Sequence, residues 1–254
     1  MGRILRPIAL PVLLVAAWWV LSADSTSPYY PPLQDILDAF RSLWFFDHMS
    51  DDVLPSVWHF VVGFLLAAVI GISLGTLVGL SARARRDVAP LTEFFRSMPI
   101  AALVPIALIL FGPGARMEIA LIAFGCCWPV LVSTADGVRA VEPTMLAVAR
   151  VYGLSRRQRL WRISIPAALP QTFAGLRVAL AIGVATMIIA NMFGSGSGLG
   201  FFVINAQQTF AVTNMWAGIL LIGLIGALAS LVLALVEHRL LRWHRGWRAS
   251  AESV

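Results

Sequence analysis

The chain has 254 residues, of which 59% are hydrophobic and only 13% are charged, and its mean hydropathy is +0.83. Soluble domains carry roughly 25% charged residues, so the composition excludes an ordinary water-soluble fold and indicates a protein of the lipid bilayer. All 19 cationic residues are arginine. Without lysine there is no GxxxxGK[ST] phosphate-binding loop and no Schiff base, which excludes ATP hydrolysis by such a loop in this chain.

Apolar stretches close to the length that crosses hydrocarbon, about 20 residues, predict the membrane spans. The first span follows Arg3 and Arg6 and is short, so a cleaved signal peptide is the alternative for it. Trp18 and Trp19 are bulky near the would-be cleavage site and favour an interfacial anchor instead. We expect an all-α, polytopic integral membrane protein with six transmembrane helices at residues 7–22, 55–80, 90–111, 118–136, 172–193 and 214–236.

These spans divide the chain into three parts. Residues 1–54 hold the N-terminal transmembrane helix and an external amphipathic segment. Residues 55–238 hold a core of five transmembrane helices with a cytoplasmic loop at 140–166. Residues 239–254 form a basic cytoplasmic tail, whose tryptophans suit a membrane interface.

The distribution of arginine predicts the orientation. If the N-terminus lies in the cytoplasm, nearly all arginines gather on the inner side and only Arg41 and Arg116 fall outside. Positively charged loops stay in the cytoplasm, so we expect both termini there. Arginines beside anionic lipid headgroups also explain the isoelectric point of about 10.6, and no nucleic-acid partner is expected.

The first external segment, residues 23–54, is acidic, with six aspartates against a single arginine. Within it, residues 33–40 alternate apolar and polar side chains at helical spacing, which predicts a surface helix lying on the membrane. Its acidic face is either a docking surface for a partner or simply a solvated face.

Residues 140–166 form a basic, polar island in the otherwise apolar chain. Helix formers occupy 143–152, Gly153 permits a sharp turn, and a second helical stretch is predicted for 155–166. The alternative is an ordinary basic loop. The order within the island is Ala147-Val148-Ala149, three residues, Gly153, nine residues, then Ile163-Ser164-Ile165-Pro166.

This spacing resembles the EAA signature of binding-protein-dependent ABC importer permeases, E-A-A-x3-G-x9-I-x-L-P. Ala149, Gly153, Ile163 and Pro166 match, whereas Ala147 stands where the signature has glutamate. The resemblance covers nearly the whole chain and looks most like the nitrate, sulfonate and taurine branch. The segments that carry it are Ser56 to Gly79, Arg96 to Pro99 with Pro105, Phe111-Gly112, Gly137 to Arg139, Pro166 to Pro170, and Gly194 to Phe202.

The resemblance implies the type I ABC importer permease (MetI-like) fold in the bacterial inner membrane. It implies a coupling helix over residues 144–152 that contacts a cytoplasmic ATPase, with Gly153 as the bend. Small alanines allow close approach of that partner, and arginines reach its acidic groups. The residues assigned to ATPase coupling are Glu142, Ala147, Ala149, Arg150, Gly153, Arg156, Arg157, Ile163 and Pro166.

The same resemblance implies the partners. They are two ABC ATPase subunits, a second permease copy that completes a homodimer, a periplasmic or lipid-anchored solute-binding protein, and membrane lipids. The chain itself is expected to be no enzyme and to hold no cofactor, because ATP and Mg²⁺ bind to the ATPase.

The resemblance places the substrate path between two copies, along the third and fifth spans. Asn191 stands where related permeases usually carry glutamate. The exchange removes a negative charge, so an anionic substrate would be repelled less along this path. A hydrogen bond between helices explains Asn191 equally well, and both interpretations stay open. The candidate lining residues are Ser97, Met98, Pro99, Thr186, Met187, Asn191 and Met192.

The glycine-rich run from Gly194 to Gly200 follows an apolar span, so it predicts a tight external return and not a nucleotide site. Gly194, Gly198 and Gly200 are assigned to this external gate. The histidines have no metal-binding spacing, and no metal site is expected. The adjacent Cys126 and Cys127 are expected to be buried thiols.

Taken together, these features predict half of an ATP-driven import path for a small, anionic solute of the sulfonate, taurine or nitrate kind. The alternative is a secondary transporter or channel that works without ATP. No charged residue occupies the centre of the fifth span, residues 180–190, so no buried ion pair or proton relay is expected. That absence argues against a proton-coupled carrier.

Overall fold

The computed structural model describes residues 2–25, 27, 29–44, 48–194 and 196–242. The predicted tail, residues 239–254 with Trp243 and Trp247, therefore lies largely outside the described residues. Throughout the described part the chain is helical, as predicted, and no strand occurs there. The elements are α1 (Gly2–Ser22), α2 (Leu33–Ser42), η2 (Met49–Val53), α3 (Leu54–Leu80), α4 (Ala82–Ser97), α5 (Ile100–Phe111), α6 (Ala115–Arg139), α7 (Pro143–Val151), α8 (Arg156–Arg159), η3 (Leu160–Ser164), α9 (Ile165–Gly194), α10 (Leu199–Gln208) and α11 (Val212–Leu240).

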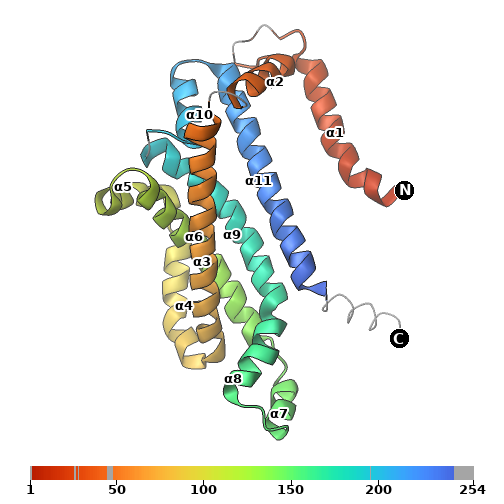
Figure 1. Cartoon of the computed structure of the whole chain (residues 1–254), viewed down its shortest axis with the longest axis vertical. Helices are drawn as coiled ribbons and strands as arrows, with labels where there is room; N and C mark the ends of the chain where they lie inside the picture. Colours follow the sequence, from red (N-terminus) through yellow and green to blue (C-terminus); the bar gives the residue numbers. More distant parts are fainter. Residues whose placement is uncertain (1, 26, 28, 45–47, 195, 243–254) are drawn as a thin grey trace.

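Three long helices form the centre of the molecule. α6 packs along α3 on one side and along α9 on the other, and these are the most extensive helix contacts in the chain (Figure 1). The loop that contains α7 and α8 projects from one end of this bundle, while α2 and α10 cover the other end. The central layer therefore connects the two ends of the molecule.

The contact between α3 and α6 depends on small residues. Every fourth residue of α3 from 63 to 79 is glycine or alanine, and all of them face α6 or the core. A Cβ at Gly71 would lie 2.8 Å from Val130 Cβ, and one at Gly75 would lie 2.5 Å from the Leu131 carbonyl oxygen. The two backbones thus approach at the distance that small-xxx-small repeats permit in membranes.

The third predicted span, 90–111, is not one straight helix but part of a sharply bent pair of helices. α4 and α5 meet at an angle of 96° with the break at Met98 and Pro99. Met98 is extended, with ψ 126°, because the residue before a proline is disfavoured in the helical region. α5 has 12 residues, which reach only about 18 Å and do not cross a bilayer alone.

Four helical segments are long and apolar enough to cross a membrane, and the bent α4–α5 pair makes a fifth if it counts as one span. The four segments are Met49–Leu80, Ala115–Arg139, Arg156–Gly194 and Val212–Leu240. In α1 the apolar stretch among the described residues covers only Val12–Ser22. The predicted polytopic membrane fold is confirmed, whereas the count of six spans is not confirmed as such.

The amphipathic stretch at 33–40 forms α2, as predicted, but its apolar face does not lie on the membrane. Leu33 and Ile36 are buried against Ala217 of α11. Next to α2, the Trp44 indole N–H donates to the Ala217 carbonyl oxygen at 3.3 Å. α2 is therefore docked on the bundle across the end of α11, and its aspartates face outward.

We predict that Gly71→Val destabilises the chain, because the new methyl groups overlap Val130 and the Cys127 carbonyl oxygen. Overpacking of this kind costs about 1–3 kcal/mol. The buried thiols Cys126 and Cys127 provide the measurement, since a thiol-reactive dye labels them only on unfolding. The midpoint of thermal labelling in detergent should fall for Gly71→Val.

The matched control for this prediction is Gly223→Val in α11. A Cβ at Gly223 meets no atom within 4 Å, so its midpoint should stay close to that of the unchanged chain. Equal midpoints for the two variants would show that the α3–α6 contact does not depend on the absence of a side chain at position 71.

Candidate functional site

The first candidate site is the loop that joins α6 to α9, residues 140–166. α7 begins at Pro143, where the missing N–H costs nothing because the first turn has no helical acceptor. Glu142 precedes it as an exposed N-cap residue, without a side-chain capping bond. α7 lies at the tip of the molecule, beyond the ends of the long helices (Figure 1).

Gly153 ends α7 in a turn that requires glycine. Its φ is +73°, in the left-handed region. The Gly153 N–H donates to the Arg150 carbonyl oxygen, and the Leu154 N–H donates to the Ala149 carbonyl oxygen, each at 3.0 Å. These two bonds define a Schellman turn. The predicted bend at Gly153 is thereby confirmed in its geometry.

After the turn, Ser155 and Gln158 form a reciprocal capping box that starts α8. α8, the π-helical segment η3 and α9 then follow without a break, so helix extends from Arg156 to Gly194. The expectation of a separate second helix over 155–166 is thus wrong. Pro166 lies in the first turn of α9, where a proline is tolerated, and it does not end the helix.

The surface of α7 differs from the prediction in one respect. Ala147 is exposed, but Ala149 is buried against its own chain and is not available to a partner. The exposed face instead carries large apolar side chains at helical spacing, namely Met145, Val148, Val151 and Tyr152. Sequence reasoning missed them, although the spacing of 145, 148 and 151 was a signal.

The remaining coupling candidates lie in the same loop. The Arg150 Nε donates to the Leu146 carbonyl oxygen at 3.3 Å. Arg156 and Arg157 are exposed, with no ion pair in the described part of the chain, and Ile163 and Pro166 are half-buried. The loop therefore presents an apolar helix face and free guanidinium groups at one end of the bundle.

The substrate-path candidates are divided between the core and a bend. Thr186, Met187 and Asn191 are buried within the chain. Ser97 is exposed at the end of α4, and Met192 is half-buried. Met98 lines a cavity of about 190 Å³ at the α4–α5 bend, together with Arg96, Trp128 and Ile182, among others.

Asn191 is part of a buried polar cluster at the opposite end from α7. The Ser56 hydroxyl donates to Asn191 Oδ1 at 2.9 Å and accepts the Leu199 N–H at 3.0 Å. Asp52 accepts the Gly198 N–H at 2.6 Å, and its other oxygen lies 2.8 Å from His48 Nδ1. A hydrogen bond between helices, one of the two interpretations of Asn191, is observed at Oδ1, while its buried Nδ2 has no partner within the described residues.

The predicted return at the glycines is observed between α9 and α10. Gly198 has a φ of +103°, and a Cβ at Gly200 would lie 2.2 Å from the Ile188 carbonyl oxygen. Gly194 packs against the Met117 side chain, and its carbonyl oxygen accepts the Gly114 N–H at 3.0 Å. These glycines bring α10 onto the backbone of α9 within one chain.

A buried polar pair joins α3 and α6, outside the fifth span for which the sequence predicted no charged pair. His59 Nδ1 of α3 lies 2.7 Å from Glu118 Oε2 of α6, and Glu118 is almost fully buried. The two residues are far apart in sequence, so no local pattern signalled the pair. Closer to α7, Arg177 of α9 is also paired with Glu237 of α11. Among the described residues no group of histidine, cysteine and carboxylate side chains could hold a metal ion.

The long apolar helices, the bent pair and the projecting loop define a multi-pass membrane transport subunit. Residues 67–243 match the family model described as "binding-protein-dependent transport system inner membrane component". The chain belongs to this family of ABC importer permeases. It is a transport subunit and not an enzyme, and the ATPase of such importers is a separate subunit.

Curated relatives extend the match over almost the full chain. The taurine transport system permease protein TauC of Escherichia coli is 32% identical, covering 92% of this chain and 88% of that protein. The putative aliphatic sulfonates transport permease protein SsuC of Bacillus subtilis is 29% identical, covering 96% and 89%. The bicarbonate transport system permease protein CmpB of Synechococcus elongatus is 36% identical, covering 74% and 68%.

Solved structures agree on the fold. A structure of the inward-facing MetNI methionine ABC transporter matches with a TM-score of 0.66 at 18% identity, covering 74% of this chain and 94% of the matched chain. The bacterial alginate ABC transporter matches with a TM-score of 0.57 at 14% identity, covering 95% and 97%. The predicted MetI-like fold is confirmed.

We predict that Ser56→Ala lowers the stability of the chain by about 1–3 kcal/mol, because the Leu199 N–H and Asn191 Oδ1 lose a buried partner. The midpoint of thermal unfolding in detergent measures the effect. Ser50→Ala is the matched control, since the Ser50 hydroxyl is exposed and bonds only to Asp51. If the unfolding midpoint of Ser56→Ala were as high as that of Ser50→Ala, the buried polar cluster around Ser56 would not stabilise the fold.

Proposed function

We propose that this chain forms half of the translocation path of an ATP-driven importer for a small anionic solute. The observation that carries the proposal is the projecting 140–166 loop, whose short helix is set by a glycine turn and presents an apolar face. An exposed apolar patch at the tip of a protein marks an interaction surface. The partner in this proposal is a cytoplasmic ATPase.

The chemistry of the loop suits such a partner. Met145 and Val148 supply apolar contact area on α7, and Arg157 supplies a free guanidinium for a carboxylate or carbonyl group of the ATPase. Met in particular adapts its shape to a partner surface. Glu142, Ala147, Arg150 and Arg156 are also exposed in this loop, whereas Ala149 is buried and Ile163 and Pro166 are half-buried.

The orientation follows from charge. The loop end of the bundle carries the arginines of α4, α7 and α8, and the opposite end carries the aspartates of α2 and η2. The positive-inside rule supports a cytoplasmic loop, with both termini in the cytoplasm of a bacterial cell. A solute-binding protein then meets the end formed by α2, η2 and α10.

A second permease copy completes the path in this proposal. α5 is too short to cross the membrane and exposes a row of large apolar side chains, with Ile109 at 85% exposure. Pairing of two such chains about a two-fold axis would place their bent α4–α5 segments around a shared path. Ser97 and Met98 at the bend are the lining residues that this arrangement favours.

The substrate class is proposed from the relatives and from charge. Sulfonates, taurine and bicarbonate, which the relatives' names specify, each carry an oxyanion group. Arg96 lines the cavity at the bend beside Met98, and Asn191 adds no negative charge in the core. Both features favour an anion over a cation along this path.

The proposed cycle involves no covalent chemistry in this chain. The binding protein delivers a solute to the outward end, and ATP binding draws the two ATPases together. Since the loop connects directly to α6 and α9, movement of α7 is transmitted to both helices of the central layer. The two copies rock apart at the loop end once hydrolysis releases the ATPases.

We predict ATP-dependent uptake of an alkyl sulfonate or taurine by liposomes that contain the chain, its ATPase and its binding protein. Vanadate should abolish uptake, because the driving force comes from ATP. Uptake driven by a proton or ion gradient without ATP would contradict the proposal and support a secondary transporter.

We predict that Gly153→Arg abolishes this uptake while membrane insertion is retained. The left-handed φ of +73° is strained for arginine. In the variant the turn therefore changes its geometry, and α7 is no longer fixed in position relative to α8. Gly153→Asn is the matched control, because asparagine tolerates this conformation, and it should keep most of the activity. Normal uptake by Gly153→Arg would contradict the coupling role of the turn.

A further inference from the structure

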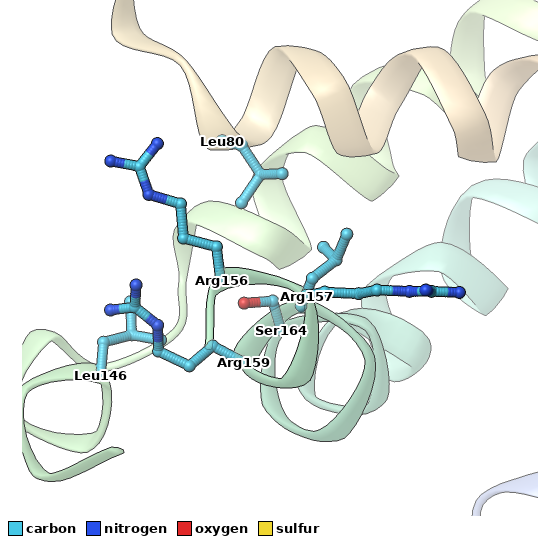
Figure 2. Close-up of a pocket in the computed structure, with 7 residues that line it drawn as sticks. Leu80, Leu146, Arg156, Arg157, Arg159 and Ser164 are labelled. Carbon is cyan, nitrogen blue, oxygen red and sulfur yellow. The ribbon is translucent and has the colours of Figure 1, made fainter. Parts of the chain in front are cut away.

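A recess of about 530 Å³ lies beside the 140–166 loop, where the loop meets the end of α3. Figure 2 shows the side chains around it, which come from α3, α7, α8 and η3. One wall is apolar and the rest is basic. The lining residues are Leu80, Leu146, Arg156, Arg157, Arg159, Leu160 and Ser164.

The charged side chains that line the recess are all positive. No acidic residue lines it, and within the described residues Arg156 and Arg159 take part in no ion pair. In Figure 2 these two side chains extend to the side where Leu146 lies, and Arg157 extends to the opposite side. Two guanidinium groups on one side can donate together to a single oxyanion.

Ser164 adds a hydroxyl group to these basic side chains. The residue is only 4% exposed, yet it lines the recess, and its hydroxyl oxygen points between Arg156 and Arg159 in Figure 2. The hydroxyl can therefore donate a hydrogen bond to a ligand in the recess. Ser164 also ends the π-helical segment η3, a rare conformation that is frequent at functional sites.

We propose that this recess binds the phosphate of an anionic phospholipid headgroup. Arg156, Arg159 and the Ser164 hydroxyl hold the phosphate, and the leucine wall contacts the start of the acyl chains. The location supports a lipid source, because Leu80 is the last residue of a helix long enough to cross the membrane. The recess therefore opens at the edge of the bilayer, where anionic headgroups are concentrated.

The bound phosphate links the end of α3 to the base of the 140–166 loop. It compensates the charge of α8 and fixes the direction in which the loop leaves the membrane surface. This role does not depend on the coupling proposal, because the lipid site is formed by one chain without an ATPase.

Native mass spectrometry of the full-length chain in detergent, loaded with phosphatidylglycerol or phosphatidylcholine, tests the site. The unchanged chain should retain phosphatidylglycerol in preference to phosphatidylcholine. The double variant Arg156→Gln/Arg159→Gln should retain about tenfold less phosphatidylglycerol, since two charge-assisted donors are lost. Arg162→Gln is the matched control, because Arg162 is an exposed arginine of the same loop outside the recess, and it should retain the lipid.

Three outcomes would overturn the proposal. Equal retention by the double variant and Arg162→Gln would show that the recess is not the lipid site. Displacement of phosphatidylglycerol by millimolar inorganic phosphate would assign the recess to a free oxyanion. Unchanged lipid retention together with lost ATPase binding in the double variant would assign these arginines to the protein partner. An unchanged thermal midpoint in the variants separates all of these results from misfolding.

Discussion

The structure depends on one contact, the close approach of the α3 and α6 backbones. Lipid chains are as apolar as leucine, so burial of apolar area supplies little drive for helices to associate within a bilayer. Association relies on packing distance instead, and the glycines of α3 at 63, 71, 75 and 79 reduce that distance to backbone contact. The same contact buries the hydrogen-bonded pair of His59 and Glu118, which needs both helices at a fixed register.

α9 packs against α6 through the same kind of glycine contact. A Cβ at Gly137 of α6 would lie 2.9 Å from the Ala168 carbonyl oxygen, and one at Gly175 of α9 would lie 2.9 Å from the Pro129 carbonyl oxygen. Glycine on each helix therefore meets the backbone of the other. The three helices form one block, and both helices that flank the 140–166 loop belong to it. In the proposed coupling, a displacement of α7 would act on the whole block, because both helices that flank the loop pack closely against each other and α6 packs against α3.

Sequence reasoning was strongest where the physical signal is local. Hydropathy located the long helices, and the spacing around Gly153 located the turn, because a left-handed glycine position is set by its neighbours in the chain. The bend at Met98 and Pro99 was missed, although the sequence contains the proline, because hydropathy carries no information on the direction of the helix axis. The burial of Ala149 and the pairing of His59 with Glu118 were also missed, since both depend on helices that are distant in sequence.

The two ends of the block have different connections, and this difference indicates which parts are free to move. At the end opposite α7, Asp52 and Ser56 accept the amide N–H groups of Gly198 and Leu199, so α10 is fixed to the block by buried hydrogen bonds. α11 is packed less closely against the rest of the chain than α6 or α9, because only 11% of its most apolar stretch is buried. α4 and α5 meet at a sharp bend. In the proposed import cycle, relative motion of two copies would therefore fall on these outer helices, while the block would transmit the displacement of α7 as a unit.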